Sequence, residues 1–517
     1  MEMTPLELNM WQRSIIRRFL RWLFRRRTVG IIGFVIFCLV TLVFLFVAEE
    51  NWRGRRAWET YRLEWEAKGE RFDLASIIPK PVPPEQNFAM TPLLAPLLDY
   101  DYEGGAVRWR DSNAVARTKS ITVQGAEDYQ GESPDLGNWQ MGEFCDMKAW
   151  QAFCRTNANF PSSPQPQEPA RDVLFALGKY DPVFAELHAA SRRPYAVYPI
   201  HYDETVFSLL PQLSVLKSLT RVVELRALAN LEAGRNEEAL ADAKLAFHLA
   251  ASLKTEPLLI SHLVQVALIQ ITLQPVWEGL TKHQWTEAQL CELQQTLASL
   301  DLLADYGIAM RGERAFANEL LAQWRAGRLP GVTADQARNV PRLPRWLMPN
   351  GFFYQNQLAI TRLHQQVFLP AVDAQAHRVY REKCDTNAIK SVLGRRTPYN
   401  MLAQLLFPAV QKLPARAAQC QTWLDLATVA CALERYRLAH GGHPESLDAL
   451  VPQFIASLPH DIVTGQPLKY RGTDDGQFVI YSVGWNEMDD GGQASLTKNG
   501  NALDWQKGDW VWQYPAK

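Results

Sequence analysis

The sequence predicts a mainly α-helical protein with an N-terminal transmembrane helix, an exported α-helical body and a small C-terminal α+β domain with antiparallel strands. Three observations predict this fold class. A run of twenty uncharged residues lies near the N-terminus, apolar residues recur at helical spacing in the middle of the chain, and two β-favouring runs joined by a turn lie near the C-terminus. We expect six regions along the chain, at residues 1–28, 29–48, 49–90, 91–170, 171–412 and 415–517.

The composition of the 517 residues excludes several classes of protein. Hydrophobic residues at 47% and charged residues at 21% are ordinary globular values, so the chain is neither disordered throughout nor a multi-span channel. The net charge of −1 argues against a nucleic-acid binder, because phosphate binding depends on a clustered basic surface. No segment carries a complete catalytic motif, and the sequence therefore assigns no reaction.

The most informative segment is Val29–Ala48, which reads VGIIGFVIFCLVTLVFLFVA and contains no charge. At about 1.5 Å per residue, a helix of this length crosses the roughly 30 Å hydrocarbon core of a bilayer. The run is longer than the ~7–15 residues of a signal-peptide core. Because no A-x-A cleavage site follows Ala48, we interpret the segment as an uncleaved membrane anchor.

Charged residues on either side of this segment predict its orientation. Glu49 and Glu50 follow it, and seven arginines precede it: Arg13, Arg17, Arg18, Arg21, Arg25, Arg26 and Arg27. By the positive-inside rule we expect a bacterial cytoplasmic (inner) membrane protein with its N-terminus in the cytoplasm and its bulk in the periplasm. Residues 10–27 interleave the arginines with aromatic and aliphatic residues, so we expect Arg13–Arg27 to bind anionic lipid of the inner leaflet.

Residues 49–170 are predicted as a stalk, a linker and a small irregular α/β segment. Glu49–Lys68 has the pattern of a charged, tryptophan-rich helix that ends at Gly69. The prolines of Pro79–Phe88 favour an extended linker. Short β-favouring runs follow at Ala106–Trp109 and Ser120–Val123, among Gly, Asp and Ser residues.

Residues 171–412 are predicted as an α-helical domain. Within it, residues 222–253 have the pattern of two helices broken at Gly234. Ala227, Gly234, Ala239 and Ala246 lie at the small-residue offsets of a tetratricopeptide repeat, which this hairpin resembles. Only one copy is visible, so we expect a repeat-like hairpin inside an all-α domain rather than a solenoid.

Cysteines and short motifs suggest chemistry but do not define it. Cys420 and Cys431 fall about 16 Å apart on one predicted helix and cannot form a disulfide, whereas Cys145 and Cys154 can pair only across a turn. Ser214 and Lys217 have the S-x-x-K spacing of penicillin-binding enzymes, but no K-T-G follows. A zinc site could use three histidines and one aspartate, although two of the histidines flank a flexible Gly-Gly turn: His440, His443, His460 and Asp461.

The C-terminal segment begins with a helix-spaced apolar stripe, and a Gly-Gly pair ends that helix. A short serine-led helix, a turn and two β-runs joined by Asp475-Gly476 follow. About 75 residues resemble the globular domain of the major pseudopilin of type II secretion. The matching residues are Tyr436, Gly441, Pro444, Leu447, Leu450, Leu458, Pro459, Asp461, Gly465, Tyr470, Ser482 and Gly484.

This resemblance implies a calcium site in the loop after the last strand of the hairpin. Calcium prefers several oxygens from carboxylates and carbonyls. The corresponding residues here are Asn486, Asp489, Asp490 and Asp504. Asn486 stands where the family usually has aspartate, which removes one charge. The alternative is an Asp-Gly loop that forms hydrogen bonds within itself.

The arrangement of the whole chain departs from that family. A pseudopilin has its membrane helix directly before the globular domain, whereas residues 49–414 intervene here. The chain resembles large membrane-anchored bacterial proteins of unknown function that end in a pseudopilin-like module. We therefore expect a scaffold that interacts with secretion or pilus assembly proteins. A membrane-tethered cell-envelope hydrolase and a substrate-binding module are the alternatives.

Overall fold

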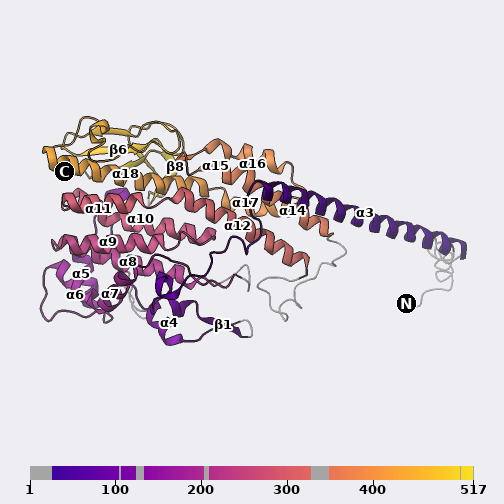
Figure 1. The fold of residues 1–517 in the computed structure, drawn as a ribbon, viewed down its shortest axis with the longest axis horizontal. Helices are drawn as coiled ribbons and strands as arrows, with labels where there is room; N and C mark the ends of the chain where they lie inside the picture. Colours follow the sequence, from indigo (N-terminus) through magenta and orange to yellow (C-terminus); the bar gives the residue numbers. More distant parts are fainter. Residues whose placement is uncertain are drawn as a thin grey trace, which may run out of the picture.

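The computed structural model describes residue 22 and residues 26–103, 106–123, 133–202, 209–327, 349–500 and 502–515. Most described elements are helices, and all described sheets are small and antiparallel. Figure 1 shows an elongated body of stacked helices from one end of which a single long helix projects. The predicted mainly α fold with small antiparallel sheets is confirmed. Arg13, Arg17, Arg18, Arg21 and Arg25 lie outside the described residues.

The projecting helix is α3 (Arg26–Ala67), a continuous helix of 42 residues. Its apolar window has a mean hydropathy of 3.1, and none of that window is buried by the rest of the chain. Beyond the apolar part, ion pairs one turn apart support the helix, such as Arg55 Nε to Glu59 Oε1 at 2.7 Å. The helix ends in a turn at Gly69, which has a φ of +95°, as the sequence predicts.

The body contains the other α-helices and the strands that the structure describes. Its helices are α4 (Ser112–Lys119), α5 (Met147–Thr156), α6 (Pro169–Leu177), α7 (Asp181–Ala190), α8 (Pro211–Glu232), α9 (Asn236–Ala251), α10 (Leu259–Thr281), α11 (Glu287–Ala298), α12 (Leu302–Arg325), α14 (Asn350–Leu363), α15 (Leu369–Ala371), α16 (Thr386–Leu393), α17 (Met401–Val410) and α18 (Leu413–His440). Its strands are β1 (Tyr100–Glu103), β2 (Ala106–Trp109), β3 (Val372–Asp373), β4 (Arg378–Val379), β5 (Lys469–Gly472), β6 (Phe478–Ser482), β7 (Ala494–Leu496), β8 (Leu503–Gly508) and β9 (Trp510–Trp512).

Local signals set several of the helix ends. Gly234, with a φ of +71°, separates α8 from α9 where the sequence predicts the break. The helix α11 starts with a capping box, in which Thr286 N–H donates to Gln289 Oε1 at 3.0 Å and Gln289 N–H to Thr286 Oγ1 at 3.4 Å. Asp301 caps α12 by accepting from Ala304 N–H at 2.9 Å.

Two hydrophobic cores hold the body together, and α18 contributes to both. The larger core joins α8, α9, α10 and α11 to α18 and to strands β6 and β9. The smaller core joins α12, α14 and α18 and includes Trp510 of β9. Helix α10 is also apolar and long enough to cross a membrane, but 61% of its apolar window is buried, as expected for a core helix. The C-terminal strands therefore share their cores with the helical body.

The largest sheet has the strand order β5-β6-β9, and every residue of its central strand β6 is buried. The predicted hairpin turn between β5 and β6 is present, with Gly476 at a φ of +78°. The strand predicted at Ala106–Trp109 is β2, which pairs with β1. The β-favouring run Ser120–Val123 forms no strand, because the Tyr180 hydroxyl rather than a neighbouring strand binds the backbone of Thr122.

Candidate functional site

The first feature is the junction between the projecting helix and the body. From Glu50 onward α3 packs along α14, and the two helices approach most closely at Gly54 and Gly351. A Cβ on Gly351 would overlap the Glu50 carbonyl, and one on Gly54 would lie 2.8 Å from the Gly351 carbonyl oxygen. Asn51 Oδ1 also accepts a hydrogen bond from Gly351 N–H at 2.8 Å. The segment predicted as a stalk is thus packed against the body.

A buried ion pair closes the same junction just after α3 ends. The side chain of Arg314, on α12, is fully buried, and its Nη2 lies 2.7 Å from Glu70 Oε2. The same nitrogen donates to the Arg71 carbonyl at 2.7 Å, and Nη1 donates to Gln365 Oε1. Burial of the Glu70 carboxyl acts to raise its pKa, but hydrogen bonds from the Arg314 and Arg311 guanidinium groups hold that pKa below its ordinary value.

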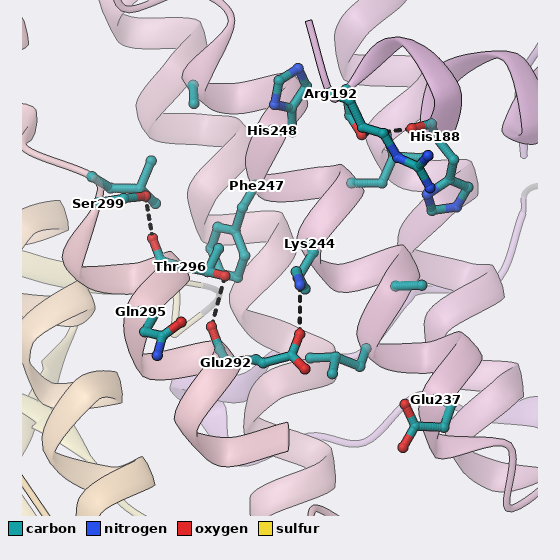
Figure 2. Close-up of a pocket in the computed structure, with 16 residues that line it drawn as sticks. His188, Arg192, Glu237, Lys244, Phe247, His248, Glu292, Gln295, Thr296 and Ser299 are labelled. Atoms are coloured by element: carbon teal, nitrogen blue, oxygen red, sulfur yellow. Dashed lines mark hydrogen bonds and ion pairs between the residues drawn. The ribbon is translucent and has the colours of Figure 1, made fainter. Parts of the chain in front are cut away.

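The second feature is a cavity of about 740 Å³ between α7 and α11, across the outer face of α9, which we call the α9 groove (Figure 2). Leu240, Leu245 and Phe247 of α9 lie beneath it and are almost fully buried, so polar side chains provide most of its accessible lining. Charges of both signs line it, and Lys244 Nζ of α9 lies 2.6 Å from Glu292 Oε2 of α11 (Figure 2). A mainly polar lining with charges of both signs suits a polar or charged segment of a partner.

A buried carboxylate holds one wall of the α9 groove in place. Asp242, on α9, is 1% exposed and accepts from Asn230 Nδ2 at 2.9 Å and Arg226 Nη1 at 3.1 Å. His188, at the end of α7, lies 3.6 Å from the same carboxylate. The Arg226 guanidinium also covers the Phe184 ring of α7 at 4.4 Å. These contacts tie α7 to the α8–α9 hairpin and fix the shape of the groove.

The third feature is a cavity of about 690 Å³ between α11, α18 and the loop 454–460. His377 lines it with a φ of +50°, and its Nε2 lies 2.8 Å from Asp425 Oδ2 of α18. That hydrogen bond raises the pKa of His377 above its ordinary value. His460 lies beside this pair, and its Nε2 is 3.0 Å from the His377 carbonyl oxygen. A histidine oriented by a carboxylate can move protons in such a cavity.

The residues predicted to bind calcium have other partners in the structure. Asp489 accepts from the Tyr481 hydroxyl at 3.0 Å and lies 3.3 Å from Lys469 Nζ. Asp490 accepts from Asn486 Nδ2 at 3.2 Å, whereas Asp504 lies on strand β8, 3.6 Å from Lys507 Nζ. Within the described ranges, no group of three or more His, Cys, Asp or Glu side chains is arranged to hold a metal ion. The calcium site stays a prediction.

The carboxylate that organises this loop is Asp509, which the sequence reasoning missed. It is 2% exposed and accepts from the N–H groups of Asp490, Gly492 and Gln493, at 3.2, 2.6 and 3.3 Å. A hydrogen-bonded loop of this kind corresponds to the alternative that the sequence left open. The only sequence signal was an aspartate between two β-favouring runs, which does not distinguish a loop anchor from a surface residue.

The other sequence candidates form separate backbone contacts. Asp461 accepts from Val463 N–H at 2.9 Å and Val483 N–H at 3.0 Å, so it joins its own turn to β6. His440 and His443 lie close to different backbone carbonyls, those of Tyr436 and Gly476. Ser214 Oγ donates to the Pro211 carbonyl at 3.1 Å. All seven cysteines are free thiols, so Cys145 and Cys154 are not paired.

Comparison with models of protein families, with curated proteins and with solved structures found no match for this chain. The ion pair of Arg314 with Glu70 and the hydrogen-bonded pair of His377 with Asp425 join residues distant in sequence, and no local motif marks them. The function must therefore be argued from the junction, the α9 groove and the sequence patterns.

Proposed function

We propose that this chain is a single-pass protein of the bacterial cytoplasmic membrane whose body acts in the periplasm as an interaction scaffold for secretion or pilus assembly proteins. The main support for the proposal is that the two halves of α3 differ in burial. None of its apolar window is buried by the part of the chain that the structure describes, whereas the half that starts at Glu50 packs into the body. An apolar helix surface of this length needs a lipid environment.

The charge distribution around α3 supports the proposed orientation. Seven arginines precede the apolar segment, and Glu49 and Glu50 follow it. The body then lies on the side opposite these arginines. Its cysteines remain stable as free thiols because most of them are buried, for example Cys420 and Cys431, whose burial raises the pKa of each thiol.

The α9 groove is the surface that we propose for the partner. It is lined by charges of both signs, Glu237 and Lys244 on α9 and Glu292 on α11. The resemblance of the C-terminal segment to a pseudopilin domain supports partners from a secretion or pilus assembly machine. Because α18 is shared between two cores of the body, this segment is better suited to a scaffold than to a filament subunit.

A second candidate function is a membrane-tethered cell-envelope hydrolase or substrate-binding module. The cavity lined by His377 and Asp425 favours it, since the carboxylate orients the imidazole and raises its pKa. Exchange of His377 for asparagine tests this candidate. If this variant changes a cell-envelope phenotype but recovers the same partners as wild type, the second function is favoured over the scaffold.

The proposed function is tested with the full chain in cells. Carbonate should fail to extract the protein from membranes, and protease added outside the cytoplasmic membrane should reach the body. Mild crosslinking followed by detergent purification should recover secretion or pilus assembly components. Extraction by carbonate, or recovery of the chain alone, would contradict the proposal.

A matched pair of variants locates the partner surface. Lys244→Glu reverses a charge in the α9 groove, whereas Arg235→Glu reverses one in an exposed ion pair with Glu238, at 3.0 Å, outside the groove. Both pairs are about half exposed, so each reversal should change stability by no more than about 1 kcal/mol. We expect Lys244→Glu alone to reduce partner recovery. Equal recovery with both variants would exclude the groove.

A further inference from the structure

A second basic surface lies next to the anchor, on the loop between α16 and α17. Asn400, which is 8% exposed, organises this loop by donating to the Arg395 carbonyl at 2.9 Å and accepting from Thr397 N–H at 2.8 Å. From α14, Asn356 Nδ2 donates to the Pro398 carbonyl at 2.9 Å. The loop is therefore held in one conformation against the body.

The loop touches α3 directly beyond the apolar segment. The Arg53 guanidinium lies 5.6 Å from the centre of the Tyr399 ring. Arg53 is five residues past Ala48, which places it about 7.5 Å along the helix from the end of the apolar run. The polar interfacial layer of a bilayer is roughly 5–7.5 Å thick on each side, so this contact lies at the outer limit of the lipid headgroups. Figure 1 shows α14 and α16 at the end of the body from which α3 emerges.

Three exposed arginines lie close in the chain to this contact, and we call them the arginine collar: Arg56, one turn after Arg53 on α3, and Arg395 and Arg396, a few residues before Tyr399 on the loop. No described carboxylate lies within ion-pair distance of any of the three, whereas Arg53 and Arg55 pair with glutamates of α3. The collar adjoins Trp52, which is 60% exposed and lies 5.3 Å from the Arg56 guanidinium. A tryptophan at this depth is typical of a membrane interface.

We propose that the arginine collar binds the phosphate groups of anionic phospholipids in the outer leaflet of the membrane that α3 crosses. This inference rests on the proposed membrane anchor. Guanidinium groups bind phosphate through charge-assisted hydrogen bonds, and basic residues beside a transmembrane helix are attracted to anionic lipid. Because the loop is fixed to α14, this second contact sets the tilt of the whole body relative to the membrane.

Site-specific photocrosslinking tests the inference in the full chain. The photoreactive residue benzoylphenylalanine replaces Thr397 in the loop, Phe44 in the apolar segment, or the exposed Leu438 near the end of α18. Each chain is reconstituted in vesicles of phosphatidylcholine, with or without phosphatidylglycerol, and lipid adducts are measured by mass spectrometry. A thermal unfolding curve confirms that each chain is folded.

We expect lipid adducts at positions 44 and 397 but not at 438. With phosphatidylglycerol, the adduct at 397 should fall about fivefold or more when Arg395→Glu and Arg396→Glu are added, or when salt near 1 M shortens the screening length to about 3 Å. The adduct at 44 should not change. An adduct at 44 without one at 397 overturns the inference and leaves the anchor intact, whereas no adduct at either position overturns the anchor itself. Equal yields at 397 in neutral and anionic vesicles, or an adduct there to a second protein chain, also overturn the inference.

Discussion

Exchange of Arg314 tests how tightly the anchor helix is joined to the body. The Arg314 guanidinium is fully buried, lies 2.7 Å from Glu70 and covers the Phe72 ring at 4.4 Å. Removing one partner of a buried pair leaves the other charge uncompensated, which costs about 3–5 kcal/mol. We therefore expect Glu70→Gln, which leaves the buried Arg314 charge without its carboxylate, to lower the free energy of unfolding by about this amount. Arg314→Met should cost less than Glu70→Gln, because Glu70 then keeps its ion pair with Arg311. The double variant removes both charges and should cost less than the sum of the two.

The matched control is Arg311→Met. Arg311 binds the same carboxylate at 3.1 Å, but its side chain is 46% exposed, so its loss should cost less than about 1 kcal/mol. Denaturant unfolding of the purified full chain in detergent measures how far each of the four variants lowers the free energy of unfolding relative to wild type. If Arg314→Met costs no more than Arg311→Met, or if the double variant shows full additivity, the junction is not held by this pair and the reasoning fails.

Further predictions concern the stability of the chain at low pH, the close helix contact at Gly351, the buried Glu256 carboxyl and the binding of Ca²⁺. Because the pKa of Glu70 is lowered, its contribution is present above the ordinary value and is lost as pH falls below about 4, so the stability difference between wild type and Glu70→Gln should shrink in acid titrations. Gly351→Ala should cost about 1–3 kcal/mol in denaturant unfolding because its Cβ overlaps α3, whereas Gly307→Ala, which meets only the end of the Arg311 side chain, should cost nothing or stabilise α12. Burial raises the pKa of Glu256 to about 7, against hydrogen bonds from Ser261 and Gln212. The folded state thus loses stability as pH rises from the ordinary value of about 4.3 towards 7, and Glu256→Gln should gain about 2–3 kcal/mol on wild type between pH 5 and pH 8 in unfolding experiments. The pseudopilin resemblance predicts that Ca²⁺ raises the Tm and that Asp489→Asn abolishes the rise; a Tm unaffected by Ca²⁺ would contradict it.

Features that depend on neighbouring residues were predictable from the sequence. The apolar helix, the turn at Gly69, the break at Gly234 and the hairpin turn at Gly476 each follow from composition or from a positive φ that glycine adopts easily. The mainly helical class follows from apolar spacing in the same way. These signals need no knowledge of the tertiary structure.

Features that depend on distant residues were not predictable. Arg314 and Glu70 are separated by 244 positions, and neither has a neighbour that marks it as buried. Residues 49–68 have the charge pattern of a solvated helix, but the structure packs one of its faces on α14, through Gly54 and Gly351 and through the buried Trp58 and Tyr61. The β-favouring run Ser120–Val123 forms no strand because such a run becomes a strand only where another strand can pair with it, which depends on distant residues.

The packing of α3 bears on how the proposed scaffold would work. A flexible stalk would let the body rotate about its anchor, and a partner would have to order it on binding. Here the helix that leaves the apolar segment is fixed to α14 through Gly351 and to α12 through Arg314 and Glu70. The α9 groove therefore keeps one orientation relative to α3 before any partner arrives. A groove fixed in this way suits a partner that is itself embedded in the same membrane, because both surfaces then meet with little further loss of rotational freedom.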